Sequence, residues 1–176
     1  MTNQQLETIF DRTLLRQNRA RFAKNFSEFN FLHEEVANKI MDSLSFMKRD
    51  FDSALEIGAR DGYLSNQLLA SGKVKKMIQT EMCDFGVKKN RVIADEEFLP
   101  FKTESFDLIV SCLNFQHVNL VPQFLVQAKE LLKKDGIFII SFFGWKDGST
   151  FLHKCRVDWI WRCVRVFTRE VGLCSP

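Results

Sequence analysis

The chain has 176 residues, of which 45% are hydrophobic and 27% are charged, and its formal net charge is +3. A chain of this length predicts one domain with a substantial core, and the composition excludes a disordered protein, a collagen and a coiled coil. No uncharged apolar run reaches the roughly 18 residues of a membrane-spanning helix, and the acids near the N-terminus argue against a signal or transit peptide. We therefore expect a cytoplasmic, bacterial protein without a membrane span.

The positive charge is concentrated at the C-terminal end. Residues 145–176 contain six basic and three acidic residues, an excess of three that equals the net charge of the chain, so the rest is neutral overall. A neutral body does not indicate nucleic acid as a partner. The five cysteines follow no zinc-site spacing, and we expect reduced thiols and no metal site.

Two amphipathic helices are expected before the first strand. Apolar residues recur at helical spacing over residues 4–24 and again over residues 31–47. Arg12, Arg16 and Arg19 share one face of the first helix, and such a basic face most often lies in solvent.

Beyond residue 49, short apolar runs alternate with helical patterns. The runs predict strands at 53–57, 74–80, 92–94, 106–112 and 137–142, with helices at 62–71 and 121–133. This alternation is typical of an α/β fold with a doubly wound, mostly parallel sheet. Such sheets bind ligands beyond the carboxyl ends of their strands, so the residues that follow each strand are the candidate site.

Three acids follow three of these strands in order. Glu56 ends the first strand in the segment EIGARDG (56–62), whose glycines permit a tight turn and a close approach to a ligand. A carboxylate there can accept hydrogen bonds from an ammonium group. Glu81 ends the second strand, where an acid can accept both hydroxyls of a ribose. Asp95 follows the third strand and can accept from an exocyclic amine of a base.

Six segments between residues 9 and 144 carry a resemblance to a known family. They are IFDRTLLRQNRARFA (9–23), FNFLHEEVANKI (29–40), ALEIGARDGYL (54–64), IQTEM (78–82), ADEEFLPFKTESFDLIVS (94–111) and LLKKDGIFIISFFG (131–144). They resemble the class I S-adenosylmethionine-dependent methyltransferases. The closest branch contains the malonyl-carrier-protein methyltransferases of biotin synthesis and a mitochondrial complex I assembly factor. The resemblance implies an S-adenosylmethionine-binding, Rossmann-like core over residues 49–144, covered by a helical lid over residues 1–48.

At the methionine end of the cofactor, the resemblance gives Glu56 the ammonium group, directly or through water. The backbone would approach this end of the cofactor at five further positions, which are Gly58, Ala59, Gly62, Cys112 and Leu113.

At the nucleoside end, the resemblance assigns the ribose hydroxyls to Glu81 and the packing against adenine to Met82. Asp95 would accept from the adenine amine, with the amide of Glu96 near the ring. In the same family the N-terminal arginines lie on a lid, where they would meet an acidic carrier protein.

No catalytic residue stands out, because the sulfonium already carries an activated methyl group and catalysis is largely alignment. Gln116 and His117 are weak candidates at the expected mouth of the active site, and His117 is expected to be able to act as an acid or base near pH 7. His33 is expected at the surface.

The sequence departs from the family at two places. Arg60 replaces the middle glycine of the loop, where a side chain would either cover the site or turn outward. Residues 145–176 form an atypical basic tail with all three tryptophans, so the fold is expected to lack its last two strands and to leave a strand edge exposed. The tail indicates either a truncated or frame-shifted product or a short helix near residues 151–168.

Three functions are therefore open. The first is methyl transfer to a small molecule or a carrier-bound carboxyl group. The second is a role like that of the complex I assembly factor, which modifies an arginine of a respiratory-complex subunit. The third is a truncated, non-catalytic remnant.

Overall fold

The computed structural model describes residues 8–86, 90–143 and 150–156. The elements in chain order, with η for a short 3-10 helix, are α1 (Arg12–Ala23), η1 (Phe26–Glu28), α2 (Phe31–Ser45), β1 (Phe51–Ile57), α3 (Tyr63–Ala70), β2 (Val74–Glu81), β3 (Arg91–Ile93), β4 (Phe106–Cys112), η2 (Phe115–His117), α4 (Val121–Leu131), β5 (Leu132–Phe143) and β6 (Thr150–Arg156).

The six strands form one sheet in the order β3-β2-β1-β4-β5-β6. Strands β1 to β5 are parallel, and β6 runs antiparallel to β5. The strand order reverses between β1 and β4, which places the switch point of the doubly wound sheet at the carboxyl ends of these two strands. The predicted fold class is confirmed.

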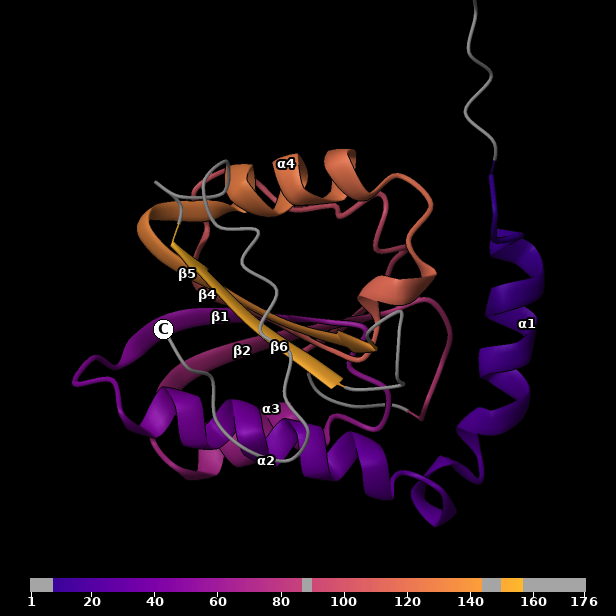
Figure 1. Ribbon diagram of the computed structural model, residues 1–176, viewed down its shortest axis with the longest axis horizontal. Coiled ribbons are helices and arrows are strands. Elements are labelled where there is room, and N and C mark those ends of the chain that lie inside the picture. Colours follow the sequence, from indigo (N-terminus) through magenta and orange to yellow (C-terminus); the bar gives the residue numbers. More distant parts are fainter. Residues whose placement is uncertain (1–7, 87–89, 144–149, 157–176) are drawn as a thin grey trace, which may run out of the picture.

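Helices cover both faces of the sheet. Figure 1 shows α4 on one face and α2 with α3 on the other, while α1 stands apart at one end of the sheet. Successive residues of β1 point to opposite faces, so Ala54 packs into the cluster under α2 and α3, and Leu55 into the cluster under α4. Near-continuous apolar strands such as β4 suit this double coverage, and every residue of β4 is buried.

Local signals set several helix ends. Asp11 caps α1, because its carboxylate accepts hydrogen bonds from the amides of Thr13 and Leu14. Gly72 follows α3 with a φ of +72°, the left-handed conformation expected for a residue that ends a helix. Pro122 occupies the first turn of α4, where its missing N–H costs nothing.

The predicted strands and the second helix agree with the structure to within a few residues, apart from the start of β5, but the two ends of the chain differ. The first helix begins at Arg12 rather than residue 4, because Asp11 caps it; residues 1–7 lie outside the described part. At the other end, Thr150–Arg156 forms β6, one strand more than the sequence predicts. The expected helix near 151–168 is therefore wrong up to Arg156, and its remainder lies outside the described residues. Because β6 pairs with β5, the edge of β5 is covered.

No helix in the described ranges is both long enough and apolar enough to cross a membrane.

Candidate functional site at the carboxyl ends of the strands

The loop between β1 and α3 is a tight turn built on left-handed residues. Gly58 and Gly62 have φ values of +73° and +79°, and Arg60 between them has a φ of +51°. The amides of Gly58 and Ala59 both donate to the carbonyl of Thr80 on β2. A Cβ atom at Gly58 would lie 2.4 Å from Cγ of Asn114, so only glycine fits there.

Glu56, at the end of β1, is fully buried. Its Oε2 accepts from the amide and the hydroxyl of Ser65 on α3. Its Oε1 has no partner within the part of the chain that the structure describes. Burial raises the pKa of Glu56 to about 7, against hydrogen bonds from Ser65 that lower it. This buried oxygen is available to a ligand that carries an ammonium group.

Glu81, at the end of β2, is surrounded by cationic and amide donors. Its Oε1 accepts from Nη1 of Arg19 at 3.0 Å and from the amide of Met82 at 2.9 Å. Its Oε2 accepts from the amide of Arg60 at 3.0 Å and from Nη1 of Arg60 at 2.9 Å. Burial raises the pKa of this carboxyl, but Arg60 and Arg19 outweigh burial and hold it below its usual value. The expected ribose acceptor thus already has two guanidinium partners.

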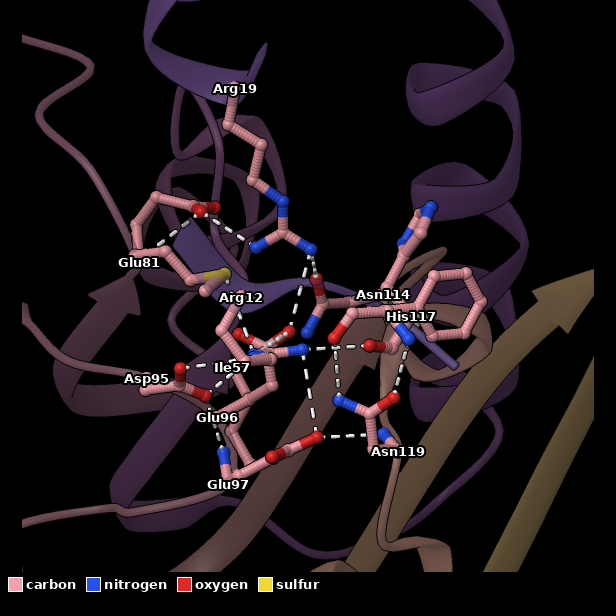
Figure 2. A network of polar contacts seen from close by, with 12 residues as sticks. Arg12, Arg19, Ile57, Glu81, Asp95, Glu96, Glu97, Asn114, His117 and Asn119 are labelled. Atoms are coloured by element: carbon pink, nitrogen blue, oxygen red, sulfur yellow. Dashed lines mark hydrogen bonds and ion pairs between the residues drawn. The ribbon is translucent and has the colours of Figure 1, made fainter. Parts of the chain in front are cut away.

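Arg12 of α1 is the cation of a second cluster, after β3. Its guanidinium forms a fork on Asp95, with Nε at 3.0 Å from Oδ2, and lies 2.9 Å from the carboxylate of Glu96. Glu97 lies further away, at 3.6 Å. Nη1 of Arg12 also donates to the carbonyl of His117. Figure 2 shows Arg12 and Arg19 lying among these acids.

Asn114 connects the two sides of the switch point, just after β4. It is fully buried, and its Oδ1 accepts from Nη2 of Arg19 at 2.6 Å and from Nη2 of Arg60 at 3.3 Å. Its Nδ2 donor has no partner among the described residues. Leu113 before it is left-handed, with a φ of +47°, and its amide donates to Ser141 of β5. Cys112 is buried, which raises the pKa of its thiol to about 12.

The two weak catalytic candidates lie on η2. Gln116 donates to the carbonyl of Leu113. The imidazole of His117 meets the ring of Phe10 edge-on, with centroids 5.9 Å apart, and its Nδ1 is buried without a partner in the described ranges. Burial, with Arg19 and Arg60 nearby, lowers the pKa of His117 to about 4, so the ring is neutral at pH 7. A neutral ring with so low a pKa is a weak general base.

An apolar cavity of about 440 Å³ lies between α1 and the strand ends. Its wall is largely aromatic, and the lining also includes both arginines that bind Glu81. The lining residues are Leu15, Asn18, Arg19, Phe22, Phe26, Phe29, Arg60, Phe85 and His117. A volume of this order suits a small organic molecule.

The structure brings the predicted site residues to one end of the sheet. The ten predicted cofactor positions lie in the last residues of β1, β2 and β4 or in the loops after β1, β2, β3 and β4, as expected from the topology. Four polar residues of this site were not predicted as ligands: Arg12, Arg19, Arg60 and Asn114. Asn114 carries a usable sequence signal, since it comes two residues after a strand at the switch point.

Two expectations about charged and polar side chains are wrong. Arg12, Arg16 and Arg19 do not form one solvated face, because Arg12 and Arg19 turn inward to the acids while Arg16 stays exposed. His33 is not at the surface: it is 6% exposed and packs edge-on against Phe26. Arg60 covers the site rather than turning outward.

Comparison with known proteins agrees with this geometry. Residues 55–140 match the family model described as methyltransferase domain. The mouse protein named "Arginine-hydroxylase NDUFAF5, mitochondrial" is 38% identical over 146 residues, which cover 77% of this chain and 42% of that protein. The Coxiella burnetii protein named "Malonyl-[acyl-carrier protein] O-methyltransferase 1" is 26% identical over 128 residues, covering 69% of this chain and 44% of the relative.

Among solved structures, the Burkholderia thailandensis 1,6-didemethyltoxoflavin-N1-methyltransferase superposes with a TM-score of 0.62 at 19% identity, covering 81% of this chain and 67% of that one. This likeness shows the fold. The chain spans less than half the length of the two curated relatives. Residues 55–140 therefore match a methyltransferase domain, and the chain has the fold of the class I methyltransferases.

Proposed function

We propose that the chain forms the cofactor-binding part of an S-adenosylmethionine-dependent methyltransferase. The observation that carries the proposal is the set of acids at successive strand ends around the left-handed glycine loop. Glu56, with a fully buried and unpartnered Oε1 among the described residues, suits the ammonium group of the cofactor. Glu81 suits the ribose hydroxyls once its arginines give way, and Asp95 suits the adenine amine.

The remaining predicted positions complete this arrangement. Met82 is fully buried beside Glu81 and would pack against adenine, with the amide of Glu96 near the ring. Backbone groups of the two loops would border the methionine end, at Gly58, Ala59, Gly62, Cys112 and Leu113.

The protein's part in such a reaction is to align two reactants. When bound, the cofactor would supply a methyl group carried on a positively charged sulfur. An acceptor oxygen or nitrogen would take up this methyl group and leave a neutral thioether. The residues described above would hold and orient the cofactor. None is required to remove a proton from an acceptor that is already ionised at neutral pH, such as a carboxylate. The apolar cavity beside His117 offers space for an acceptor.

A second candidate rests on the 38% identity to the mouse arginine hydroxylase. By this proposal the chain modifies a protein arginine, and the acceptor is a polypeptide rather than a small molecule or a carrier-bound carboxyl group. The cytoplasmic location expected from the sequence stays a prediction, since that relative is named as mitochondrial.

Calorimetry with S-adenosylmethionine tests the proposal first. We expect micromolar binding to the purified chain, weakened about tenfold in Asp95→Ala because one hydrogen bond to a charged group is lost. Asp42→Ala, which removes an exposed acid from α2, is the matched control and should bind like the wild type. A folded wild-type chain that binds no cofactor contradicts the proposal.

Mass spectrometry of acceptors then separates the two candidates. A small acid or carrier-bound carboxyl that gains a methyl group supports the first. The second is assayed with dioxygen and an electron donor supplied as co-reactants, because hydroxylation is an oxidation. An arginine-containing peptide that then gains an oxygen atom, with no methyl gain on any acid, supports the second.

A further inference from the structure

Arg60, in the loop between β1 and α3, adopts a left-handed backbone conformation that favours glycine, and its side chain is buried in the site. Its φ is +51° and it is 8% exposed, so a guanidinium is buried where a glycine would leave open space. The guanidinium reaches Oε2 of Glu81 and Oδ1 of Asn114. Left-handed backbone and a buried charge both carry a free-energy cost, so the position of Arg60 needs a compensating role.

Hydrogen-bond donors outnumber acceptors around this guanidinium. Arg19 and Arg60 share the single carboxylate of Glu81 and the single amide oxygen of Asn114. Glu96 lies 3.5 Å from Arg19 but is also the partner of Arg12. Burial and the nearby Arg60 lower the pKa of Arg19, against Glu81 and Glu96, which raise it.

Among the buried polar atoms without a partner in the described ranges, three belong to Arg19, Asn114 and Glu56. Two are donors, Nε of Arg19 and Nδ2 of Asn114, and one is an acceptor, Oε1 of Glu56. The residues that carry them are each more than nine-tenths buried. Gly58, two residues after Glu56, lies against the Asn114 side chain. Unpaired donors beside two guanidiniums favour a carboxylate, and an unpaired carboxylate oxygen favours an ammonium group.

We infer that Arg60, Arg19 and Asn114 form a carboxylate-binding site for the amino-acid end of the cofactor, opposite Glu56 as its ammonium-binding site. In the free chain Glu81 takes the place of that carboxylate. When the ligand carboxylate binds the arginines, Glu81 is released and accepts the ribose hydroxyls instead. This inference rests on the proposed function and adds Arg60 to the binding site.

The exchange couples the two halves of the ligand. A ligand without the amino-acid part leaves the arginines on Glu81, and it must compete with them for the ribose acceptor. A ligand with the carboxylate supplies the arginines with a new partner, so its affinity depends on Arg60 far more strongly.

The test compares two ligands by calorimetry on the whole chain. S-adenosylhomocysteine carries the amino-acid group, and methylthioadenosine lacks it. The measured quantity is the affinity for S-adenosylhomocysteine divided by the affinity for methylthioadenosine. We expect Arg60→Gln to lower this ratio by about tenfold to a hundredfold, the effect of losing a hydrogen bond between charged groups. Arg16→Gln, on the exposed side of α1, is the matched control and should keep the wild-type ratio.

Two further variants keep the test decisive if Arg60→Gln does not fold. Arg60→Gly suits the left-handed backbone, and Arg19→Gln removes the second guanidinium; both should lower the ratio in the same direction. If both ligands bind and the ratio is unchanged in every folded variant, the inference is overturned while the proposed function stands. If neither ligand binds the folded wild type, the proposed function fails and the inference with it.

Discussion

Arg60 donates twice to the same oxygen of Glu81, from its backbone amide at 3.0 Å and from its guanidinium at 2.9 Å. The backbone donation needs only the turn of the glycine loop, which any residue able to adopt a left-handed φ provides. The side-chain donation needs an arginine. Glu81 therefore ties the loop after β1 to the end of β2 in two ways, and only one of them depends on the residue at position 60.

The pairing of Glu81 with two arginines is expected to dominate the stability of this end of the sheet. Glu81→Gln leaves two buried guanidiniums without a full counter-charge and should lower the free energy of unfolding by about 3–5 kcal/mol. Adding Arg60→Gly should restore part of this loss, with a coupling energy of about 1–3 kcal/mol. Urea denaturation of the two single variants and the double variant measures both quantities. Glu35→Gln, at an exposed acid on α2, is the control, and strict additivity would contradict the pairing.

Gly58, in the loop after β1, and Gly72, after α3, allow the cost of a steric overlap to be separated from the cost of a left-handed backbone. Their φ values are +73° and +72°, but a Cβ atom at Gly72 would meet no described atom within 4 Å. Gly72→Ala should cost about 1 kcal/mol, the penalty of the left-handed backbone alone. Gly58→Ala should cost a further 1–3 kcal/mol or so, because its methyl group overlaps Asn114. Equal losses in thermal or urea unfolding would mean that Asn114 moves aside without cost.

The carboxyl of Glu56 should make the chain less stable as the pH rises. Its pKa is 4.5 in an ordinary environment and about 7 here, so the folded chain binds this proton more tightly than the unfolded chain does. Its contribution to stability therefore falls between pH 4.5 and pH 7. Glu56→Gln removes this fall, and above pH 7 the variant should exceed the wild type by roughly 3 kcal/mol. Unfolding free energies measured between pH 4.5 and pH 7 test this prediction. The control variant Glu35→Gln should follow the wild-type pH profile. A profile of Glu56→Gln that runs parallel to that of the wild type would contradict the assignment.

His33 should have the opposite pH dependence. Burial lowers its pKa from 6.5 to about 4, with Arg60 contributing, so the unfolded chain binds its proton more readily. Stability from this group is complete above pH 6.5 and is lost as the pH falls toward 4, by roughly 3 kcal/mol. The wild type should lose this stability as the pH falls, whereas His33→Leu and the polar variant His33→Gln should not. An unchanged acid limb in both variants would place His33 in contact with solvent.

The sequence by itself determined most of the elements and the place of the candidate site. Period-two and period-3.6 apolar patterns are local, and the alternation of strands and helices fixes a doubly wound sheet with its site at the strand ends. Glu56, Glu81 and Asp95 could be located for that reason alone. Even the left-handed turn at Gly58 and Gly62 follows from the residue type.

Only the tertiary structure decided which partners the charged and buried side chains have. Arg19 meets Glu81 across 62 positions of the chain and Arg12 meets Asp95 across 83, and no local pattern encodes such a pairing. The same holds for the inward direction of the Arg12 and Arg19 side chains, for the burial of His33 and for the pairing of β6 with β5. Each depends on which surfaces the rest of the fold leaves open. Whether a basic helix face meets water or a carboxylate depends on which segment of the fold lies opposite, and that follows only when the whole chain has packed.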